Sequence, residues 1–455
     1  MTRAAGRAIA RYSLLLVLPV CAPSAASAQD DRSQSPGPLA APFTPVRLLE
    51  AAEASERRQE SEPKGRGWRV RWDDHPSLRF GRDTRIDFRA RFQADVRESE
   101  APVGDVGDVD LARRRIGVDG RIAGFVDFQV EGELTSDDPW RDVYADFRRW
   151  TVFRVQVGHF KLPFSLDENT SAVDLDFVYR SRAATQLAAG RDWGVMVHGR
   201  LARSIIGYEA GRFDHDGRNA RTDNPDRVYG NATLAGRLTA QPFRHRKKSS
   251  LEDLEVGVAV TESDVPEGFA SIRGRTALDA AFFPADLWVH GRRERLGLEA
   301  RWRPGPFSVK AEYIRVSTER VGQGVDDRDL SPLVGSGWYV SGTWAVTGQA
   351  KAEGLDRPRS SILRGGVGAI ELAARIEALG FDSGASGEPP STSPRADVIA
   401  GNRDRVVTLG VNWYPLRHIK IQANVLRDAI ADAAEGPLPS KPAFWSMVMR
   451  FQLSI

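Results

Sequence analysis

Arginine recurs at alternate positions in several stretches of this sequence, and its side chain is well suited to binding anions. Between residues 85 and 91, for example, Arg85, Arg89 and Arg91 fall on the same side of an alternating pattern. A guanidinium group can donate two parallel hydrogen bonds to a phosphate or a carboxylate. A row of such groups that holds each anion only weakly would form an anion-selective passage. The arginines that best fit this chemistry are Arg85, Arg89, Arg91, Arg113, Arg115, Arg154, Arg295, Arg301 and Arg375.

The elements that would position these arginines are β-strands. From Arg85 to Val96 every even position is apolar and every odd position is polar. Successive side chains of a strand point to opposite faces, so such a strand has one apolar wall and one polar wall. We predict sixteen strands of this kind, near residues 85–96, 111–122, 125–134, 142–149, 152–160, 192–201, 204–213, 228–238, 254–261, 293–303, 306–316, 337–346, 367–377, 404–413, 418–427 and 445–455.

The connections between these strands favour a membrane barrel over a soluble β protein. Long connections alternate with very short ones such as residues 123–124 and 304–305. Unequal loops and an even number of strands are typical of bacterial outer-membrane barrels, whereas a soluble sandwich or propeller needs neither. Residues 239–253 and 347–366 lie on the short side and are longer than this pattern predicts, so they are either internal turns or errors in the predicted strand boundaries.

After the first thirty residues no apolar run approaches the length of a membrane helix, so a spanning structure would have to be a barrel. We therefore predict an all-β fold: a transmembrane antiparallel β-barrel of about 16 strands, with long extracellular loops and mostly short periplasmic turns.

The first 28 residues have the order of a secretory signal peptide, with three arginines, then the apolar run 14–20, then the small residues 26–28. Residues 29–67 are rich in Pro, Ser, Ala and charge, which predicts a flexible or partly helical periplasmic extension. The barrel is predicted to occupy residues 68–455, in the outer membrane of a Gram-negative cell. Its first residues, Trp68 to Trp72, fit either a short strand or a segment at the barrel mouth.

Charge and cysteine content exclude several functions. The chain has 64 Lys and Arg and 61 Asp and Glu; the first 28 residues contain three arginines and no acids, so removing them leaves 61 of each sign. Net charge near zero gives no reason to expect nucleic acid as a partner. The single cysteine, Cys21, lies in the predicted signal, so disulfides and thiolate metal sites are not expected. A lipoprotein interpretation of Cys21 is disfavoured because Val20 is larger than the residue that normally precedes a lipidated cysteine.

Catalytic and cofactor motifs are also missing from the sequence. We find no Walker loop, no zinc spacing, no calcium loop, and no histidine beside a serine with a third orienting group. We therefore predict no metal, no cofactor and no enzymatic activity. A barrel with a purely structural or enzymatic role is the alternative class.

Particular motifs within these strands resemble the phosphate-selective porin O and P family of outer-membrane channels, over roughly residues 70–455. Each motif is mostly an alternating strand with a turn, so the motifs are specific only in combination. They span residues 111–120, 155–171, 190–195, 297–302, 305–313, 337–344, 368–375 and 410–415.

This resemblance implies a porin, trimeric in the family, that is embedded in outer-membrane lipid and passes small anions, with phosphate or polyphosphate favoured. In the family a loop folds inward and narrows the pore, and by position the corresponding segment runs from Lys161 to Arg191. It offers Lys161, Arg180, Arg182 and Arg191 as constriction residues.

Acidic residues support a competing interpretation. The inward segment also carries Asp167 and Glu168, and the arginine-bearing strand faces carry Asp87, Asp119 and Glu131 among others. Many arginines could therefore pair with acids across neighbouring strands and only stiffen the wall. A general porin of low selectivity is the corresponding alternative function. Arg218 and Arg221 fall in a predicted outer loop, away from the pore.

Overall fold

The computed structural model describes residues 67–72, 75–101, 109–134, 139–220, 232–246, 249–283, 287–351, 354, 358–382, 401–433 and 441–455. Clustering of contacts separates residues 1–44 from the unit Pro45–Ile455. All described residues belong to this unit. The predicted signal peptide, the predicted extension up to residue 66, and Arg221 lie outside the described residues.

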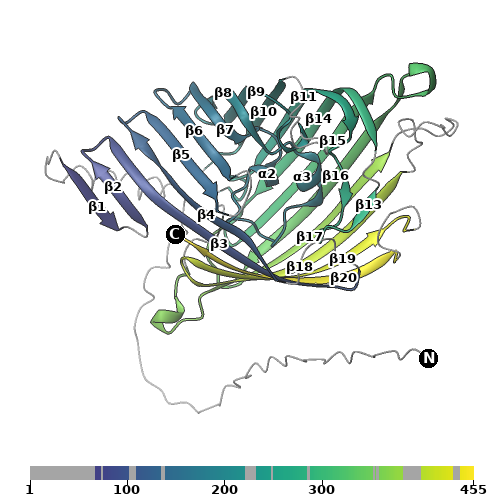
Figure 1. The fold of residues 1–455 in the computed structure, drawn as a ribbon. Helices are drawn as coiled ribbons and strands as arrows, with labels where there is room; N and C mark the ends of the chain where they lie inside the picture. Colours follow the sequence, from purple (N-terminus) through teal and green to yellow (C-terminus); the bar gives the residue numbers. More distant parts are fainter. Residues whose placement is uncertain are drawn as a thin grey trace, which may run out of the picture. The chain divides into compact units, whose positions relative to one another are not determined.

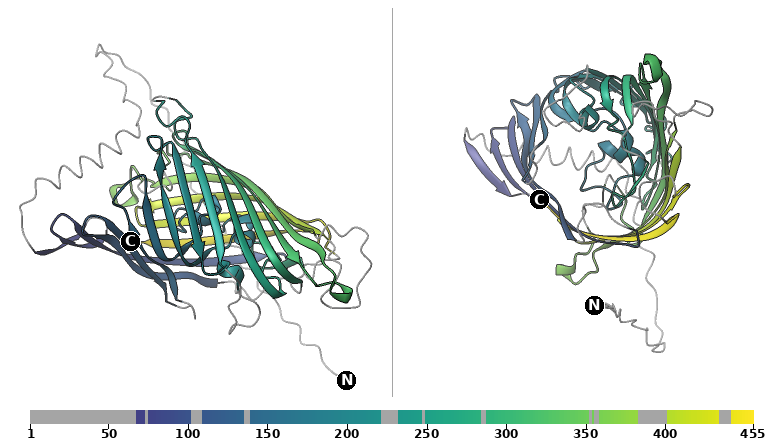
Figure 2. Two further views of the ribbon diagram at one scale, coloured as in Figure 1. Left: turned by 90° about the horizontal axis from the view of Figure 1, so that it is seen from above. Right: turned by 45° about the vertical axis from the view of Figure 1, so that its right-hand side comes forward.

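Sixteen antiparallel strands close on themselves into a barrel (Figures 1 and 2). Each strand pairs with its neighbours in sequence, and the last strand pairs with the first to close the ring. The all-β barrel predicted from the alternating pattern is therefore confirmed. The strands are β3 (Thr84–Ser99), β4 (Val109–Ile122), β5 (Val126–Glu133), β6 (Trp140–Phe147), β7 (Arg154–Lys161), β8 (Arg191–Leu201), β9 (Ile206–Phe213), β10 (Thr233–Ala240), β11 (Glu255–Phe269), β14 (Trp288–Trp302), β15 (Phe307–Arg320), β16 (Leu330–Ala345), β17 (Ala369–Asp382), β18 (Asn402–Leu416), β19 (Ile419–Ile430) and β20 (Ala443–Ser454).

The strands keep one apolar and one polar face, as the period of two requires. In β18, Val407, Leu409 and Val411 are exposed on the outside, whereas Asp404 and Asn412 are fully buried inside. The outer surface is thus apolar, as lipid contact requires, and the interior is polar. No helix among the described residues has the length and apolar character needed to span a membrane.

Two long connections lie at the end of the barrel that otherwise has tight turns. Residues 241–254 join β10 to β11, and residues 346–368, which include the short helix η3 (Ile362–Arg364), join β16 to β17. The unusual lengths seen in the sequence are therefore internal turns, not errors in strand assignment. Two further short helices, η1 (Gly217–Ala220) and η2 (Val325–Asp327), lie in loops at the opposite end.

One hairpin extends the barrel sheet, and one small separate sheet supplements the ring. The hairpin of β1 (Trp68–Trp72) and β2 (Pro76–Phe80) pairs with the first residues of β3 and extends the sheet outside the ring, so the segment left open between two interpretations is a strand (Figure 1). Strands β12 (Gly274–Arg275) and β13 (Ala281–Phe283) pair with each other in the connection between β11 and β14.

Candidate functional site

The connection between β7 and β8, residues 162–190, folds into the barrel and carries two short helices, α2 (Leu166–Asn169) and α3 (Arg182–Leu187) (Figure 2). Pro163 ends the strand because it has no N–H for the ladder. The Ser165 hydroxyl then accepts a hydrogen bond from the Glu168 N–H at 3.1 Å, and the Ser181 hydroxyl accepts one from the Ala184 N–H at 3.2 Å. Side-chain caps of this kind start both helices. We call residues 162–190 the inward loop.

Glycines on β16 let α3 approach the wall. A Cβ atom built on Gly337 would lie 2.8 Å from the Cβ of Ala183, and one on Gly335 would lie 2.9 Å from the Leu187 side chain. Non-bonded carbon atoms do not approach one another this closely, so a larger residue at position 337 would displace the helix, and one at position 335 would displace the Leu187 side chain. The inward loop therefore packs directly on the wall at this point.

Wall side chains hold the inward loop by its backbone. The Glu312 carboxylate accepts the N–H groups of Leu166 and Asp167 at 3.1 and 3.2 Å. The Glu377 carboxylate accepts the Arg182 N–H at 2.6 Å, and the Asn424 side chain accepts that of Val178 at 2.7 Å. These partners lie on β15, β17 and β19, so the loop is fastened along a continuous part of the barrel interior.

Charged side chains add to this attachment. Asp176 of the inward loop lies 2.9 Å from Lys310 on β15 and also pairs with Lys351, which belongs to the long connection between β16 and β17. Burial alone would raise the pKa of Asp176, but the charges of the two lysines outweigh this and lower it. The carboxylate is therefore ionised at neutral pH and links an extracellular loop to a periplasmic turn.

The inward loop leaves a cavity of about 620 Å³ between itself and the wall formed by β3 to β9. Seven of the residues proposed from the sequence surround it: three strand arginines and all four residues of the inward segment. Eight cationic side chains face five acidic ones across this first cavity. The cations are Arg91, Arg113, Arg115, Lys161, Arg180, Arg182, Arg191 and Arg218, and the acids are Glu131, Asp142, Glu168, Glu209 and Asp279.

Most of these cations are paired, and Arg113 is the exception among the strand arginines. Arg115 lies 2.8 Å from Glu133 and 3.1 Å from Glu131. Arg113 donates a hydrogen bond to the Gln93 side-chain oxygen at 2.5 Å and forms no ion pair with a described residue. Its charge is the one that an anion in the cavity would best complement.

Glu168 is the acid of the inward loop that faces this cavity. Burial alone would raise its pKa, but Arg218, Arg180 and Lys161 lower the pKa to about 2. Arg180 and Arg218 each lie 3.6 Å from its carboxylate. Glu168 therefore offsets part of the positive charge at every pH near neutral.

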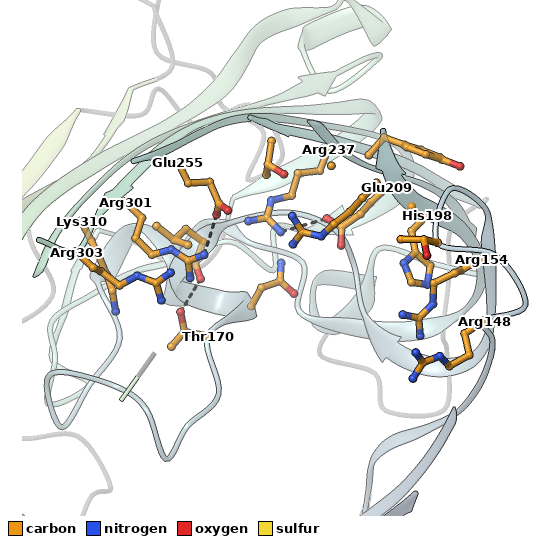
Figure 3. Close-up of a pocket in the computed structure, with 18 of the residues that line it drawn as sticks. Arg148, Arg154, Thr170, His198, Glu209, Arg237, Glu255, Arg301, Arg303 and Lys310 are labelled. Carbon is orange, nitrogen blue, oxygen red and sulfur yellow. Dashed lines mark hydrogen bonds and ion pairs between the residues drawn. The ribbon is translucent and has the colours of Figure 1, made fainter. Parts of the chain in front are cut away.

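A second cavity of about 370 Å³ lies closer to the tight turns (Figure 3). Its lining is more strongly basic, with seven arginines and lysines against two acids. Two residues proposed from the sequence, Arg154 and Arg301, are among them. The charged residues that line the second cavity are Arg148, Arg154, Arg200, Glu209, Arg237, Glu255, Arg301, Arg303 and Lys310.

The two cavities share Asn169 and Glu209 in their linings. The Asn169 side chain donates hydrogen bonds to the carbonyls of Phe164 and Ser165, both at 3.0 Å, which fixes it at the end of α2. Glu209 on β9 lies 3.1 Å from Arg237 on β10. An ion that moves from one cavity to the other would therefore pass between α2 and this part of the wall.

The remaining four residues proposed from the sequence line neither cavity. Arg85 and Arg89 have half-exposed side chains near the start of β3 and pair with Asp87 and Asp119.

Arg295 and Arg375 are 2% and 4% exposed, and each donates a hydrogen bond to a carbonyl of the inward loop, at 2.8 and 3.0 Å. They lie inside the barrel but beneath the loop.

Several lining residues were not proposed from the sequence. Arg237 follows the inward register of β10, so its alternation was a usable signal. Arg218 and Asn169 had no such signal, because loops have no periodicity. Arg218 lies in the loop between β9 and β10, as expected, but not away from the pore: it lines the first cavity and donates hydrogen bonds to the carbonyls of Ala184 and Ala188, both at 2.9 Å. No group of three or more potential metal ligands is found in the part of the chain that the structure describes.

A closed barrel with an apolar outside, a polar interior and a loop folded into its lumen defines a channel-forming outer-membrane protein. The comparisons with known proteins are more specific. The chain belongs to the phosphate-selective porin O and P family, whose model matches residues 86–455. The resemblance inferred from the strand motifs is thus confirmed, and with it the outer-membrane location.

Similarity to individual proteins is more limited. Porin O of Pseudomonas aeruginosa is 26% identical over 130 residues, which cover 28% of this chain and 28% of that protein. Among solved structures, OmpT of Vibrio cholerae has a TM-score of 0.53 at 12% identity, with 82% of this chain and 98% of that chain covered. OmpF of Salmonella typhi, solved with daunomycin, has a TM-score of 0.51 at 9% identity, with 82% and 98% covered. At such identities the structures establish the fold alone.

Proposed function

We propose that this protein is an anion-preferring porin in which small anions, phosphate and polyphosphate among them, pass through the two cavities in series. The observation that carries the proposal is the charge of the linings, with eight cations against five acids in the first cavity and seven against two in the second. Cationic linings raise the local concentration of anions, and weak sites in succession let them leave again.

The proposal assigns different roles to the arginines singled out from the sequence. Arg91, Arg113 and Arg115 would contact anions in the first cavity together with Lys161, Arg180, Arg182 and Arg191 of the inward loop. Arg154 and Arg301 would contact them in the second. Arg85 and Arg89 would attract anions only at the periplasmic mouth. Arg295 and Arg375 would hold the loop in place instead of meeting the permeant ion.

A general porin of low selectivity is the second candidate. It is favoured by the ion pairs within the linings, such as Arg191 with Asp142 at 2.7 Å and Arg301 with Glu255 at 2.9 Å, which reduce the field that an ion meets. Fold and family indicate a channel, and we propose no catalytic role. Export by a signal peptide over residues 1–28, a periplasmic extension over 29–67 and assembly as a homotrimer belong to the same proposal, supported by the sequence and the family.

Reversal potentials of the reconstituted porin in asymmetric salt test this function. We expect an anion-to-cation permeability ratio above one and a chloride current reduced by added phosphate. Arg113→Gln should lower the ratio about fivefold, since removal of one charge near the ion changes its energy by about 1 kcal/mol even in a watery environment.

Arg292→Gln is the matched control for this variant. Arg292 is more than half exposed on the outside of β14 and loses the same charge away from both cavities. An anion-to-cation permeability ratio near one for the wild-type protein would favour the low-selectivity porin. Equal ratios for Arg113→Gln and Arg292→Gln would remove Arg113 from the anion path.

A further inference from the structure

The hairpin β1–β2 exposes a row of large apolar side chains on one face. Trp68 is 58% exposed, Val70 80%, Trp72 69% and Phe80 42%. We call these four residues the aromatic face. Large apolar patches on a protein surface mark a site of contact with a partner or a membrane.

The register of the sheet makes the aromatic face a continuation of the outer wall of the barrel. Trp68 pairs with Phe80, and Phe80 pairs with Thr84 of β3. Alternate residues of a strand lie on the same face, so Thr84 shares its face of β3 with Phe88 and Phe92, which point outward on the lipid-facing surface. The lipid-facing surface therefore extends without interruption from the barrel onto the hairpin.

The position of the hairpin along the barrel determines how deeply it can lie in the bilayer. It joins β3 at the end of the barrel that has the tight turns, where the Gly124 N–H donates a hydrogen bond to the Asp83 carbonyl at 2.8 Å. This is the periplasmic end in outer-membrane barrels. β1 is the outer strand of the hairpin, so backbone groups on its far side point away from the barrel (Figure 1). Such groups need water and cannot lie in the hydrocarbon core.

The opposite face of the hairpin has the contrasting chemistry. Arg69 pairs with Arg79, and Arg79 pairs with Arg85 on β3, so arginines of three strands stand side by side on the face that continues the barrel interior. One face thus suits acyl chains and the other suits water. Tryptophan is enriched at the level of the lipid headgroups, where its amphipathic ring can contact both acyl chains and water.

We propose that the hairpin β1–β2 lies at the headgroup level of the periplasmic leaflet and seats its aromatic face against phospholipid. Continuity with the lipid-facing wall favours lipid over a second protein chain as the occupant of this face. This inference does not depend on which ions the pore conducts.

Single nitroxide labels test the proposal in the full chain, reconstituted into vesicles of phosphatidylethanolamine and phosphatidylglycerol. The label is placed at Val70→Cys in a Cys21→Ser background, which has no other cysteine. Collision with lipid-soluble oxygen is compared with collision with a water-soluble nickel chelate. Leu409→Cys, on the outer wall and 59% exposed, is the lipid reference, and Arg69→Cys on the opposite face is the aqueous reference.

We expect the ratio of oxygen to nickel collisions at Val70 to exceed that at Arg69 severalfold and to stay below that at Leu409, as the headgroup level requires. A ratio equal to that at Arg69 would overturn the proposal. Protection from both reagents, together with spin–spin broadening that grows with protein density, would overturn it in favour of a contact between copies of the chain. Trp72→Cys repeats the measurement on the same face if the Val70 variant does not fold.

Discussion

Two large parts of the barrel wall, seven strands each, have the same sequence pattern but different interiors. We call β3 to β9 the open wall and β14 to β20 the docked wall. Both alternate apolar and polar residues, and both place arginines inside. On the open wall Arg91, Arg113 and Arg115 face a cavity. On the docked wall Arg295 and Arg375 are buried beneath the inward loop. The role of an interior arginine is thus decided by the loop and not by its strand.

Hydrogen bonding explains why the docked wall is closed to ions where the inward loop covers it. Loop carbonyls in an interior need donors, and an arginine supplies several in fixed geometry. Arg295 donates to the Leu187 carbonyl and lies 2.6 Å from Asp216, and Arg450 donates to the Val178 carbonyl at 2.7 Å. Their charge and donors are already used within the protein. The open wall retains polar groups that can meet a passing solute in both cavities, whereas on the docked wall Arg301 and Lys310, near the tight turns, line the second cavity.

Replacing one arginine on each wall with glutamine should give the largest difference in the free energy of unfolding between the two walls. Arg295→Gln leaves Asp216 and a loop carbonyl with fewer partners in a buried place, and the loss of one member of a buried pair costs about 3–5 kcal/mol. Arg113→Gln breaks no ion pair with a described residue and should change stability by less than about 1 kcal/mol. Urea unfolding in vesicles, followed by tryptophan fluorescence, measures both. Equal losses for the two variants would show that the walls do not differ in this way.

Substitutions on the outer, lipid-facing side should cost the same unfolding free energy on both walls. Phe92 on the open wall and Leu298 on the docked wall both point outward, with exposed fractions of 36% and 48%. An arginine at either position should cost about 2–4 kcal/mol near the bilayer midplane. The same unfolding experiment measures this cost.

Matched substitutions on the inside should distinguish the walls. Gln156→Arg, on the lining of the first cavity, should be tolerated. Gln422→Arg should not, because Gln422 is 1% exposed and donates to the Leu175 carbonyl of the inward loop. A tolerated Phe92→Arg would mean that the assigned register is wrong.

The sequence contained the strands but not the difference between the walls. A period of two is a local signal, and it located all sixteen barrel strands to within a few residues at most ends. Arg113 and Arg295 both occupy polar positions of an alternating strand. Arg295 differs because it donates a hydrogen bond to the carbonyl of Leu187, a residue 108 positions earlier in the sequence. A contact of that sequence separation leaves no mark on either strand.

The resemblance to the family predicted that the segment after β7 folds into the barrel, and the strand pattern alone could not have predicted this. Its two helices are four and six residues long and have no repeat to detect. The connection between β11 and β14 shows the same limit. Its Thr276 and Asp279 line the first cavity, and nothing in the alternation pointed to them.

The smallest expected effect concerns Glu168, the loop acid that faces the open wall. Its pKa is lowered to about 2, mainly by Arg218 and Arg180. A carboxyl group whose pKa is lower in the folded state than in the unfolded state stabilises the fold at high pH, and this contribution is lost as the pH falls through the folded pKa. The window here runs from the usual value near 4.5 down to about 2.

Glu168→Gln removes this contribution and should destabilise the porin at pH 7. The loss should be about 1–3 kcal/mol, because a carboxyl pKa lowered from 4.5 to about 2 corresponds to about 3 kcal/mol, and the paired guanidinium groups lie at 3.6 Å without direct hydrogen bonds. The difference in unfolding free energy between wild type and variant should stay constant from pH 8 to 5 and shrink below pH 4.5. Removing an acid from the first cavity should also raise the anion-to-cation permeability ratio at pH 7. A stability difference that is unchanged between pH 7 and 3 would show that Glu168 does not hold the loop through its charge, and the attachment would then rest on the docked wall alone.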